Sequence, residues 1–385
     1  MKPLIAAFAL AVLGGLISPM APGALAADAA PVPACGPWPA WESFRGHFLN
    51  EGGRVVDSST PEKVTTSEGQ SYGLFYALVS NDRASFDRIL RWTEDNLAGG
   101  DLTARLPAWQ WGQGSDGQWG VLDSNAASDS DLWIAYVLLE AGRLWQSDRY
   151  TAIGELLAQR ILREEVTDLP KLGPTMLPGP KGFAFADHWR LNPSYVPVQL
   201  LRRMALAYPK SAWPKVLGSS MDVLVRSAPR GLSPDWVGYS ADKGFQADED
   251  TKGVGSYNAI RVYLWAGMLP ADEPLRGPLL KTLAPMARLT ATVGTPPLET
   301  DTRQGAGTGI GPTGFSAALL PFLSALGDKD ALRAQRLRVE ARDPLSRDDN
   351  YYEQALTLFG LGWMEGRFRF GRDGRLLPNW TCAGK

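Results

Sequence analysis

The sequence predicts an all-α protein. Apolar residues recur at spacings of three and four along much of the chain, the period of a helix with one buried face. The connecting segments are rich in Gly, Pro, Asn and Asp, and alternating strand patterns are confined to short pieces at 54–56 and 367–370. No fixed repeat, linker or low-complexity tract interrupts this pattern.

The expected helices follow one another along the chain, each bounded by loop residues. In order they cover 73–79, 84–96, 131–145, 151–165, 197–208, 221–227, 259–267, 275–289, 316–326, 331–341 and 351–365. Paired helices of this size can close into a toroid whose loops form a groove at one end. An extended solenoid is the alternative. Because the composition does not change along the chain, we expect one domain over residues 27–385.

The first 26 residues are typical of a cleaved secretory signal peptide. Lys2 precedes an apolar run that ends in small residues around Ala24 to Ala26. A membrane span is the competing interpretation, but the run is short and contains Gly14, Gly15 and two prolines. We therefore expect a periplasmic or secreted protein without a membrane span in its mature chain.

The two cysteines lie near opposite ends of the mature chain. In an oxidising compartment, Cys35 and Cys382 are expected to form a disulfide, the alternative being two unpaired thiols. Closing so long a loop stabilises the fold by about 4–5 kcal/mol in the chain-entropy model. The only histidines, His47 and His188, have no ligand-like spacing with the cysteines, so no metal site is expected.

Charge and aromatic content favour a neutral partner. The net charge is -2, which gives no reason to expect binding to nucleic acid. The chain has 14 Trp, 11 Tyr and 13 Phe, many beside Gly, Pro, Asn or Asp. Flat aromatic faces in a polar groove suit sugar rings, although most aromatic residues in any protein pack in its core. Trp109, Trp111 and Trp189 lie in loop-like segments where either role is open.

One carboxylate, Glu68, lies in the segment VTTSEGQSYG (64–73), where a helix begins. A carboxyl group beside glycines and partly removed from water has a raised pKa and can act as a general acid. The alternative is a capping motif, in which Thr66 or Ser67 caps the helix and Glu68 satisfies its first amides.

Two further segments carry polar residues at helix starts. Three aspartates, Asp123, Asp129 and Asp131, precede or open one helix, more than capping requires. Calcium binding is conceivable there but lacks the spaced ligands of a calcium loop, and Asp129 can instead bind a sugar hydroxyl. In the other segment, Asn258 and Arg261 are three apart and share a helix face.

Four motifs together resemble the family-8 glycoside hydrolases, and in particular the periplasmic endoglucanases encoded with bacterial cellulose synthase. They are TSEGQSYG (66–73), ASDSDLWIA (127–135), NPSY (192–195) and SYNAIR (256–261), in family order across the mature chain.

The resemblance implies an (α/α)6 barrel that hydrolyses a β-1,4-glucan with inversion and without a cofactor. Glu68 matches the proton donor and Asp129 the carboxylate that holds the sugar at the cleavage point. Tyr195 and Arg261 match residues lining that subsite. The three tryptophans named above would stack on sugar rings. The protein is expected to be a monomer, with the cellulose synthase export complex as a further candidate partner.

The sequence departs from the family at Asn258, where cellulose-operon enzymes carry the aspartate that acts as general base. A neutral amide cannot take that proton. The base could come from the acidic run at 242–250 or from Asp129, or the protein could be a weakly active or non-catalytic glucan-binding protein. A polysaccharide lyase using Tyr195, Asn258 and Arg261 is a third class.

Overall fold

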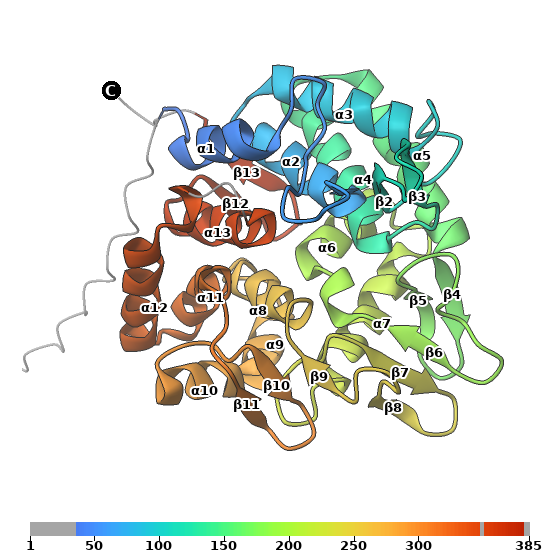
Figure 1. Cartoon of the computed structure of the whole chain (residues 1–385). Coiled ribbons are helices and arrows are strands. Elements are labelled where there is room, and N and C mark those ends of the chain that lie inside the picture. Colours follow the sequence, from blue (N-terminus) through green and yellow to red (C-terminus); the bar gives the residue numbers. More distant parts are fainter. Residues whose placement is uncertain (1–35, 347–349, 381–385) are drawn as a thin grey trace, which may run out of the picture.

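The structure is a computed structural model that describes residues 36–346 and 350–380 (Figure 1). The expected signal peptide and the disulfide between Cys35 and Cys382 lie outside these residues. The described part contains thirteen α-helices, which confirms the all-α class. They are α1 (Pro39–Phe48), α2 (Ser67–Val79), α3 (Arg83–Leu97), α4 (Ser128–Leu144), α5 (Asp148–Glu164), α6 (Val198–Ala207), α7 (Trp213–Arg226), α8 (Ala259–Gly267), α9 (Arg276–Leu283), α10 (Pro285–Val293), α11 (Thr313–Leu326), α12 (Lys329–Arg342) and α13 (Tyr351–Met364).

Six helices form an inner ring. In chain order, α2 packs on α4, α4 on α6, α6 on α8, α8 on α11 and α11 on α13. The ring closes between α13 and α2, where the Tyr76 hydroxyl donates to the carbonyl oxygen of Ala355 at 2.8 Å. Beside this bond the rings of Phe75 and Phe359 stack, with centroids 5.2 Å apart. Closure excludes the extended solenoid.

An outer helix covers each member of the ring. The outer helices α3, α5, α7, α9 and α12 pack on α2, α4, α6, α8 and α11, and α1 packs on α13. All 9 residues of α8 are buried, whereas α3 and α5 bury one face, as helices inside and outside a toroid must. Six such pairs make the (α/α)6 barrel that the resemblance implied.

Several helices differ from the sequence prediction. Helix α2 begins at Ser67, before the expected start at 73. The expected helix at 275–289 is two helices, because Pro285 has no N–H for the preceding turn and begins α10 instead. Helix α1 was not predicted. Helix α7 begins at Trp213, well before the expected start at 221, with Pro214 in its first turn.

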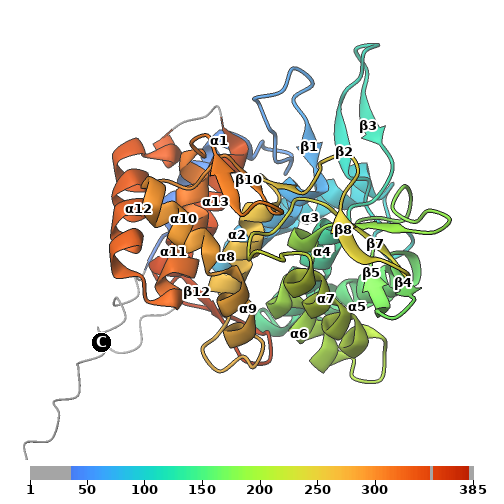
Figure 2. The same ribbon diagram turned by 90° about the horizontal axis from the view of Figure 1, so that it is seen from below.

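Thirteen short strands in the described chain form five small antiparallel sheets, where the sequence indicated almost none. They have 2 to 5 residues, too few for a clear alternation. Figure 2 shows β1, β2, β3 and β10 at one end of the ring and β12 at the other. The strands are β1 (Thr65–Thr66), β2 (Gln110–Gln113), β3 (Trp119–Asp123), β4 (Val166–Leu169), β5 (Gly173–Met176), β6 (Trp189–Leu191), β7 (Val237–Ser240), β8 (Gly244–Ala247), β9 (Val254–Gly255), β10 (Glu299–Asp301), β11 (Ala306–Thr308), β12 (Phe368–Phe370) and β13 (Leu376–Pro378).

Close packing within the ring depends on Gly360 of α13. A Cβ atom on this residue would overlap the carbonyl group of Ala317 in α11. We expect Gly360→Ala to lower the free energy of unfolding by about 1–3 kcal/mol or more, the order found for overpacked cores. Urea unfolding measures this change. The control is Gly218→Ala in the exposed face of α7, where a Cβ meets no atom within 4 Å and should stabilise by about 0.5–1 kcal/mol. Equal effects of the two changes would contradict the packing argument.

Candidate active site

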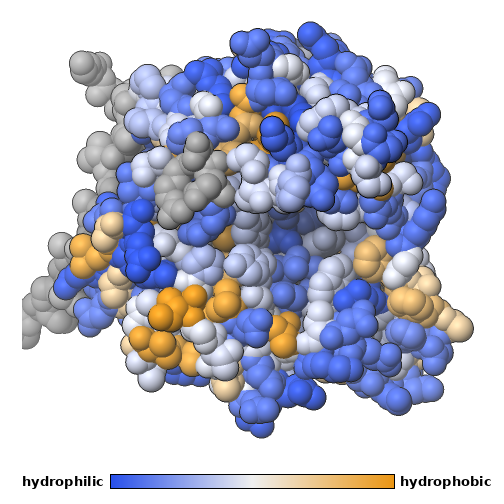
Figure 3. Space-filling model, in the orientation of Figure 1, coloured by the Kyte–Doolittle hydropathy of each residue, from blue (hydrophilic) through white to orange (hydrophobic). Residues whose placement is uncertain are grey.

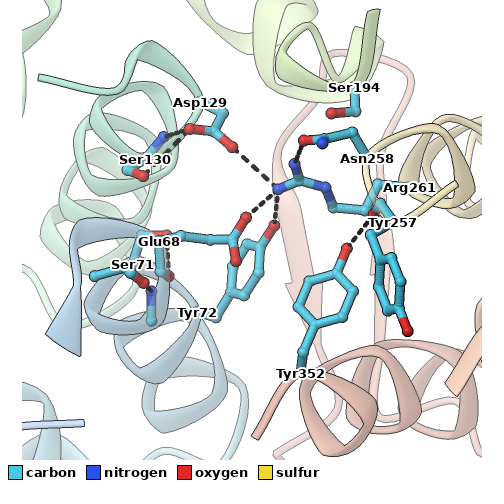
Figure 4. A network of polar contacts seen from close by, with 12 residues as sticks. Glu68, Ser71, Tyr72, Asp129, Ser130, Ser194, Tyr257, Asn258, Arg261 and Tyr352 are labelled. Atoms are coloured by element: carbon cyan, nitrogen blue, oxygen red, sulfur yellow. Dashed lines mark hydrogen bonds and ion pairs between the residues drawn. The ribbon is translucent and has the colours of Figure 1, made fainter. Parts of the chain in front are cut away.

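The guanidinium of Arg261 joins side chains from three inner helices (Figure 4). Its Nη1 donates to Glu68, to Asp129 at 3.0 Å and to the Tyr72 hydroxyl at 3.1 Å. Its Nη2 donates to Oδ1 of Asn258 at 2.7 Å. Polar residues of three motifs that are distant in sequence therefore meet at one group inside the ring.

Glu68 does not cap its helix. The N-cap of α2 is Thr66, whose hydroxyl accepts from the Gly69 amide at 3.0 Å. Glu68 is the one residue of α2 that is not buried, and its side chain is 22% exposed. Its carboxylate reaches the centre of the ring and keeps access to solvent, whereas Gln70 turns away and binds the amide of Val55. The geometry favours the chemical interpretation over the capping one.

Burial raises the pKa of Glu68 above its ordinary value, although Arg261 opposes the shift. The pKa of Asp129 is raised by burial in the same way, against Arg261 and the hydrogen bonds from Ser130. Two carboxylates and one guanidinium thus share a site with little water. Burial alone would lower the pKa of Arg261, but Glu68 and the neighbouring groups raise it, so the guanidinium stays charged.

Asp129 opens α4 and is almost fully buried, with 4% of its surface exposed. Its Oδ1 accepts from the amide of Ser130 at 2.8 Å, and its Oδ2 accepts from Arg261. Because Glu68 and Asp129 accept from the same nitrogen, their nearest oxygens lie within about 6 Å of each other. Both carboxylates therefore lie on one side of the guanidinium.

Asn258 lies on the other side of the guanidinium. Its Oδ1 accepts from Arg261 and, at 3.2 Å, from Nδ2 of Asn192. The side chain that replaces the expected base is therefore held in place by two donors.

Two carboxylates of the acidic run at 242–250 pair with Arg190 and not with Arg261. Asp248 is 5% exposed and binds Arg190 at 2.8 Å. Asp250 is exposed and faces the same arginine at 3.4 Å. Within the described chain, the ion pairs of this run are separate from those that join Arg261 to Glu68 and Asp129.

Tyr195 ends the 3-10 turn η1 (Pro193–Tyr195), which Asn192 caps at its start. The Arg261 carbon Cζ lies 5.7 Å from the centre of the tyrosine ring. Tyr195 therefore lines the same site.

The three tryptophans occupy different places. Trp109 is partly buried, and its carbonyl accepts from the amide of Ser67, next to Glu68. The ring of Trp111 already contacts the rings of Trp92 and Trp119 and, at 4.4 Å, the guanidinium of Arg54. Sugar stacking on Trp111 would have to compete with these contacts.

Trp189 packs beside Tyr239 in a small hydrophobic cluster next to the barrel core. An exposed ring lies elsewhere: Tyr257, next to Asn258, is 49% exposed and contacts Phe315 and Tyr352. Its carbonyl accepts from the Tyr352 hydroxyl at 2.6 Å.

The face seen in Figure 1 is hollowed near its middle, in the region that α2, α4, α8 and α13 surround (Figure 3). These helices carry Glu68, Asp129 and Arg261. A hollow that they surround would give a polymeric substrate access to the carboxylates of the site. Among residues 36–346 and 350–380, no group of three or more His, Cys, Asp or Glu side chains is arranged to hold a metal ion. Nor is any helix of that part long and apolar enough to cross a membrane.

Known proteins resemble this chain in sequence and in fold. Residues 17–366 match glycosyl hydrolases family 8. The chain belongs to this family. A protein of Xanthomonas axonopodis named endoglucanase is 52% identical over 94% of this chain and 97% of its own, and one of Escherichia coli is 50% identical over 90% and 93%.

Solved structures of glucanases agree with the fold. An endo-1,4-D-glucanase from Vibrio fischeri has a TM-score of 0.86 at 49% identity, covering 89% of this chain and 99% of its own. An endo-β-1,4-glucanase from Acetobacter xylinum has a TM-score of 0.68 at 26% identity, covering 85% and 96%. The protein is a glycoside hydrolase with the (α/α)6 barrel of its family.

Sequence reasoning missed several groups at this family-8 site. Tyr72 is four residues after Glu68 and so on the same helix face, a signal that was available. Asn192 opens the NPSY motif, but the motif did not place its side chain against Asn258. Asp235 had no such signal, because it reaches residue 258 from another loop.

Behind the site of this family-8 enzyme lies a buried pair of acids, Asp131 of α4 and Glu165 at the end of α5. Neither is exposed, and no other group of the described chain donates a hydrogen bond to their carboxyl oxygens. Burial raises the pKa of both acids well above the ordinary range, and for Glu165 the charge of Asp131 adds to the shift. The pair therefore retains a proton that an unfolded chain would release.

This pair makes stability depend on pH. Above about pH 4 the unfolded chain loses protons that the folded pair keeps, so stability falls as pH rises, by about 1.4 kcal/mol per pH unit for each proton. We expect Asp131→Asn to make that fall shallower, as measured by urea unfolding between about pH 5 and pH 8. The same change at the exposed Asp272 should leave the slope as it is. A slope unaltered by Asp131→Asn would contradict the retained proton.

Proposed function

We propose that the protein is an endo-β-1,4-glucanase in which Glu68 is the general acid. The observation that carries this proposal is the position of Glu68, a partly exposed carboxylate with a raised pKa at the centre of the ring. A general acid must hold its proton near the working pH and still reach the oxygen of the leaving sugar. The names of the relatives support a glucan as substrate.

Asp129, Tyr195 and Arg261 are proposed to bind the sugar at the cleavage point. Asp129 is buried and already accepts from Arg261 and Ser130, which suits a positioning carboxylate better than a proton acceptor. We further propose hydrolysis with inversion. An inverting pair needs carboxyl groups about 6.5–9.5 Å apart with a water between them. Glu68 and Asp129 approach one shared nitrogen and leave little room for that water.

The cellular setting is proposed from the sequence. A signal peptide at 1–26 would send the enzyme to the periplasm or beyond, where Cys35 and Cys382 could pair. The mature chain, 27–385, would act as a single catalytic domain and a monomer on glucan made by a cellulose synthase. Contact with the synthase export complex belongs to the same proposal.

The loss of viscosity of soluble carboxymethylcellulose, measured together with new reducing ends, tests the activity. A large fall in viscosity for few new ends is expected, because an endo-acting enzyme cuts inside the chain. Proton spectroscopy of the fresh products should show the α-anomer first if the reaction inverts. Activity no greater than that of Glu68→Gln would overturn the proposal.

Asn258 favours a second candidate, a glucan-binding protein with little activity. Its amide occupies the position of the expected base and cannot accept a proton. Calorimetry with cello-oligosaccharides would then show tight binding without products, even after long incubation. Rapid cleavage would exclude this candidate. The lyase alternative loses its support, because the chain belongs to a family of hydrolases.

A further inference from the structure

Asp235 is a carboxylate that hydrogen-bonds residue 258 itself. It lies in the loop before β7, more than twenty residues upstream of the helix it serves. Its Oδ1 accepts from the amides of Ser256 at 2.8 Å, Asn258 at 3.0 Å and Ala259 at 2.7 Å. A loop carboxylate thus anchors the start of α8, the helix that carries Arg261.

Only one oxygen of Asp235 is used by this anchor. Within the described chain, Oδ2 makes no hydrogen bond and is not among the fully buried unpaired atoms. The residue as a whole is half-buried. Oδ2 is therefore a carboxylate oxygen with access to water, beside the residue that should have supplied the base.

The surroundings of Asp235 belong to the site. Arg261 lowers the pKa of Asp235 against burial, and the charge of Asp235 adds to burial in raising the pKa of Tyr263 and Tyr352. The next residue, Trp236, contacts the Tyr195 ring with centroids 6.1 Å apart. Asp235 therefore adjoins Asn258, and Trp236 adjoins Tyr195, two residues of the site.

Two other carboxylates suggested for this task already have partners. Asp129 lies on the Glu68 side of the guanidinium, and Asp248 is bound to Arg190. Asp235 differs from both, because it adjoins Asn258 on the far side of Arg261 and has a free oxygen.

We propose that Asp235 supplies the proton-accepting carboxylate that position 258 lacks. It would act through one water held between its Oδ2 and the side-chain amide of Asn258. This inference rests on the inverting hydrolysis proposed above. The attacking water forms a bond to the anomeric carbon as the glycosidic C–O bond breaks. Glu68 gives its proton to the departing oxygen. The attacking water gives one proton to the bridging water, which passes one to Asp235, so both carboxyl groups exchange protons with solvent before the next turnover.

A double-mutant cycle tests this role against that of a mere anchor. In the natural chain, Asp235→Asn should lower kcat by about 10²–10⁴-fold, the usual contribution of a general base. The asparagine oxygen can still accept from the three amides. In an Asn258→Asp chain, the carboxylate introduced at position 258 would itself accept the proton. Adding Asp235→Asn to that chain should therefore lower kcat by a factor at least about ten times smaller than in the natural chain. Equal losses in the two chains would overturn the proposal and leave Asp235 as an anchor only.

The pH profile provides a test that leaves Asp235 intact. Burial raises the pKa of Asp235, against its backbone hydrogen bonds and Arg261. An aspartate at 258 would instead contact the Arg261 guanidinium directly and lie beside Asp235, so its electrostatic environment would differ from that of Asp235. A base must be deprotonated, so the pH at which kcat/KM begins to fall on acidification should differ between the natural chain and Asn258→Asp. Coinciding acid limbs would overturn the proposal even if Asp235→Asn failed to fold.

Two controls separate this inference from the proposed function. Thermal melting and calorimetry with cellopentaose should show that Asp235→Asn folds and binds like the natural chain. If the natural chain is no more active than Glu68→Gln, whereas Asn258→Asp is more active than Glu68→Gln, the proposed activity fails and Asp235 is not a base. If the natural chain is active and Asp235→Asn retains that activity, the role of Asp235 is refuted and the proposed function is not.

Discussion

Replacement of Glu68 by glutamine should lower kcat on cellulosic substrates by about 10²–10⁴-fold, the usual contribution of a general acid. The amide has nearly the same shape and its oxygen can still accept from Arg261, but it cannot give a proton to the departing sugar. KM should change little, because the interactions that hold the glucan are retained. Initial rates on cellohexaose measure both constants.

The choice of leaving group shows whether the loss is chemical. An aryl cello-oligosaccharide with a dinitrophenolate leaving group needs no proton on departure. On this substrate Glu68→Gln should lose far less activity than on cellohexaose. Equal losses on both substrates would show that Glu68 has a structural role.

Thr66→Ala is the matched control for that structural role. It removes the true cap of α2 and should cost about 1 kcal/mol of stability, with activity per folded molecule unchanged. The natural enzyme should also lose activity as pH rises through the raised pKa of Glu68, since the acid form is needed. That basic limb should vanish in Glu68→Gln on the activated substrate.

The barrel was largely predictable because its helices carry apolar residues at spacings of three and four, and some inner helices are apolar on almost every side. A segment such as α11, buried from Thr313 to Leu323, can lie only inside a large protein. The short strands were not predictable, because pieces of 2 to 5 residues carry too few positions to show a period. Their pairing is decided by contacts between distant loops, such as β9 with β10.

The site was predictable where a motif carries its own chemistry. Glu68, Asp129 and Arg261 meet as the resemblance implied. The anchor made by Asp235 and the acid pair of Asp131 and Glu165 were not predictable, because each joins segments more than twenty residues apart. Burial, which sets the pKa of these acids, belongs to the folded chain and not to any local pattern.

Arg261→Met should produce the largest combined loss of stability and activity. The residue is 3% exposed, and its guanidinium neutralises two buried carboxylates, Glu68 and Asp129. Removal of one partner from a buried ion pair costs about 3–5 kcal/mol, because the remaining charge is left without compensation. Urea unfolding should show this loss, and initial rates should show almost no turnover because Asn258 and Glu68 lose their common donor.

The loss in Arg261→Met should also grow with pH. Without the guanidinium, the pKa of both carboxyls rises further, so the folded state keeps protons that the unfolded chain releases above about pH 4, and stability falls as pH rises. Arg202→Met is the matched control: it breaks a partly buried pair with Glu273, at 2.6 Å, away from the site. It should lose stability yet retain its activity per folded molecule. If both variants kept their activity, Arg261 would serve the fold alone; if only Arg261→Met lost it, the guanidinium holds the acid in its working position.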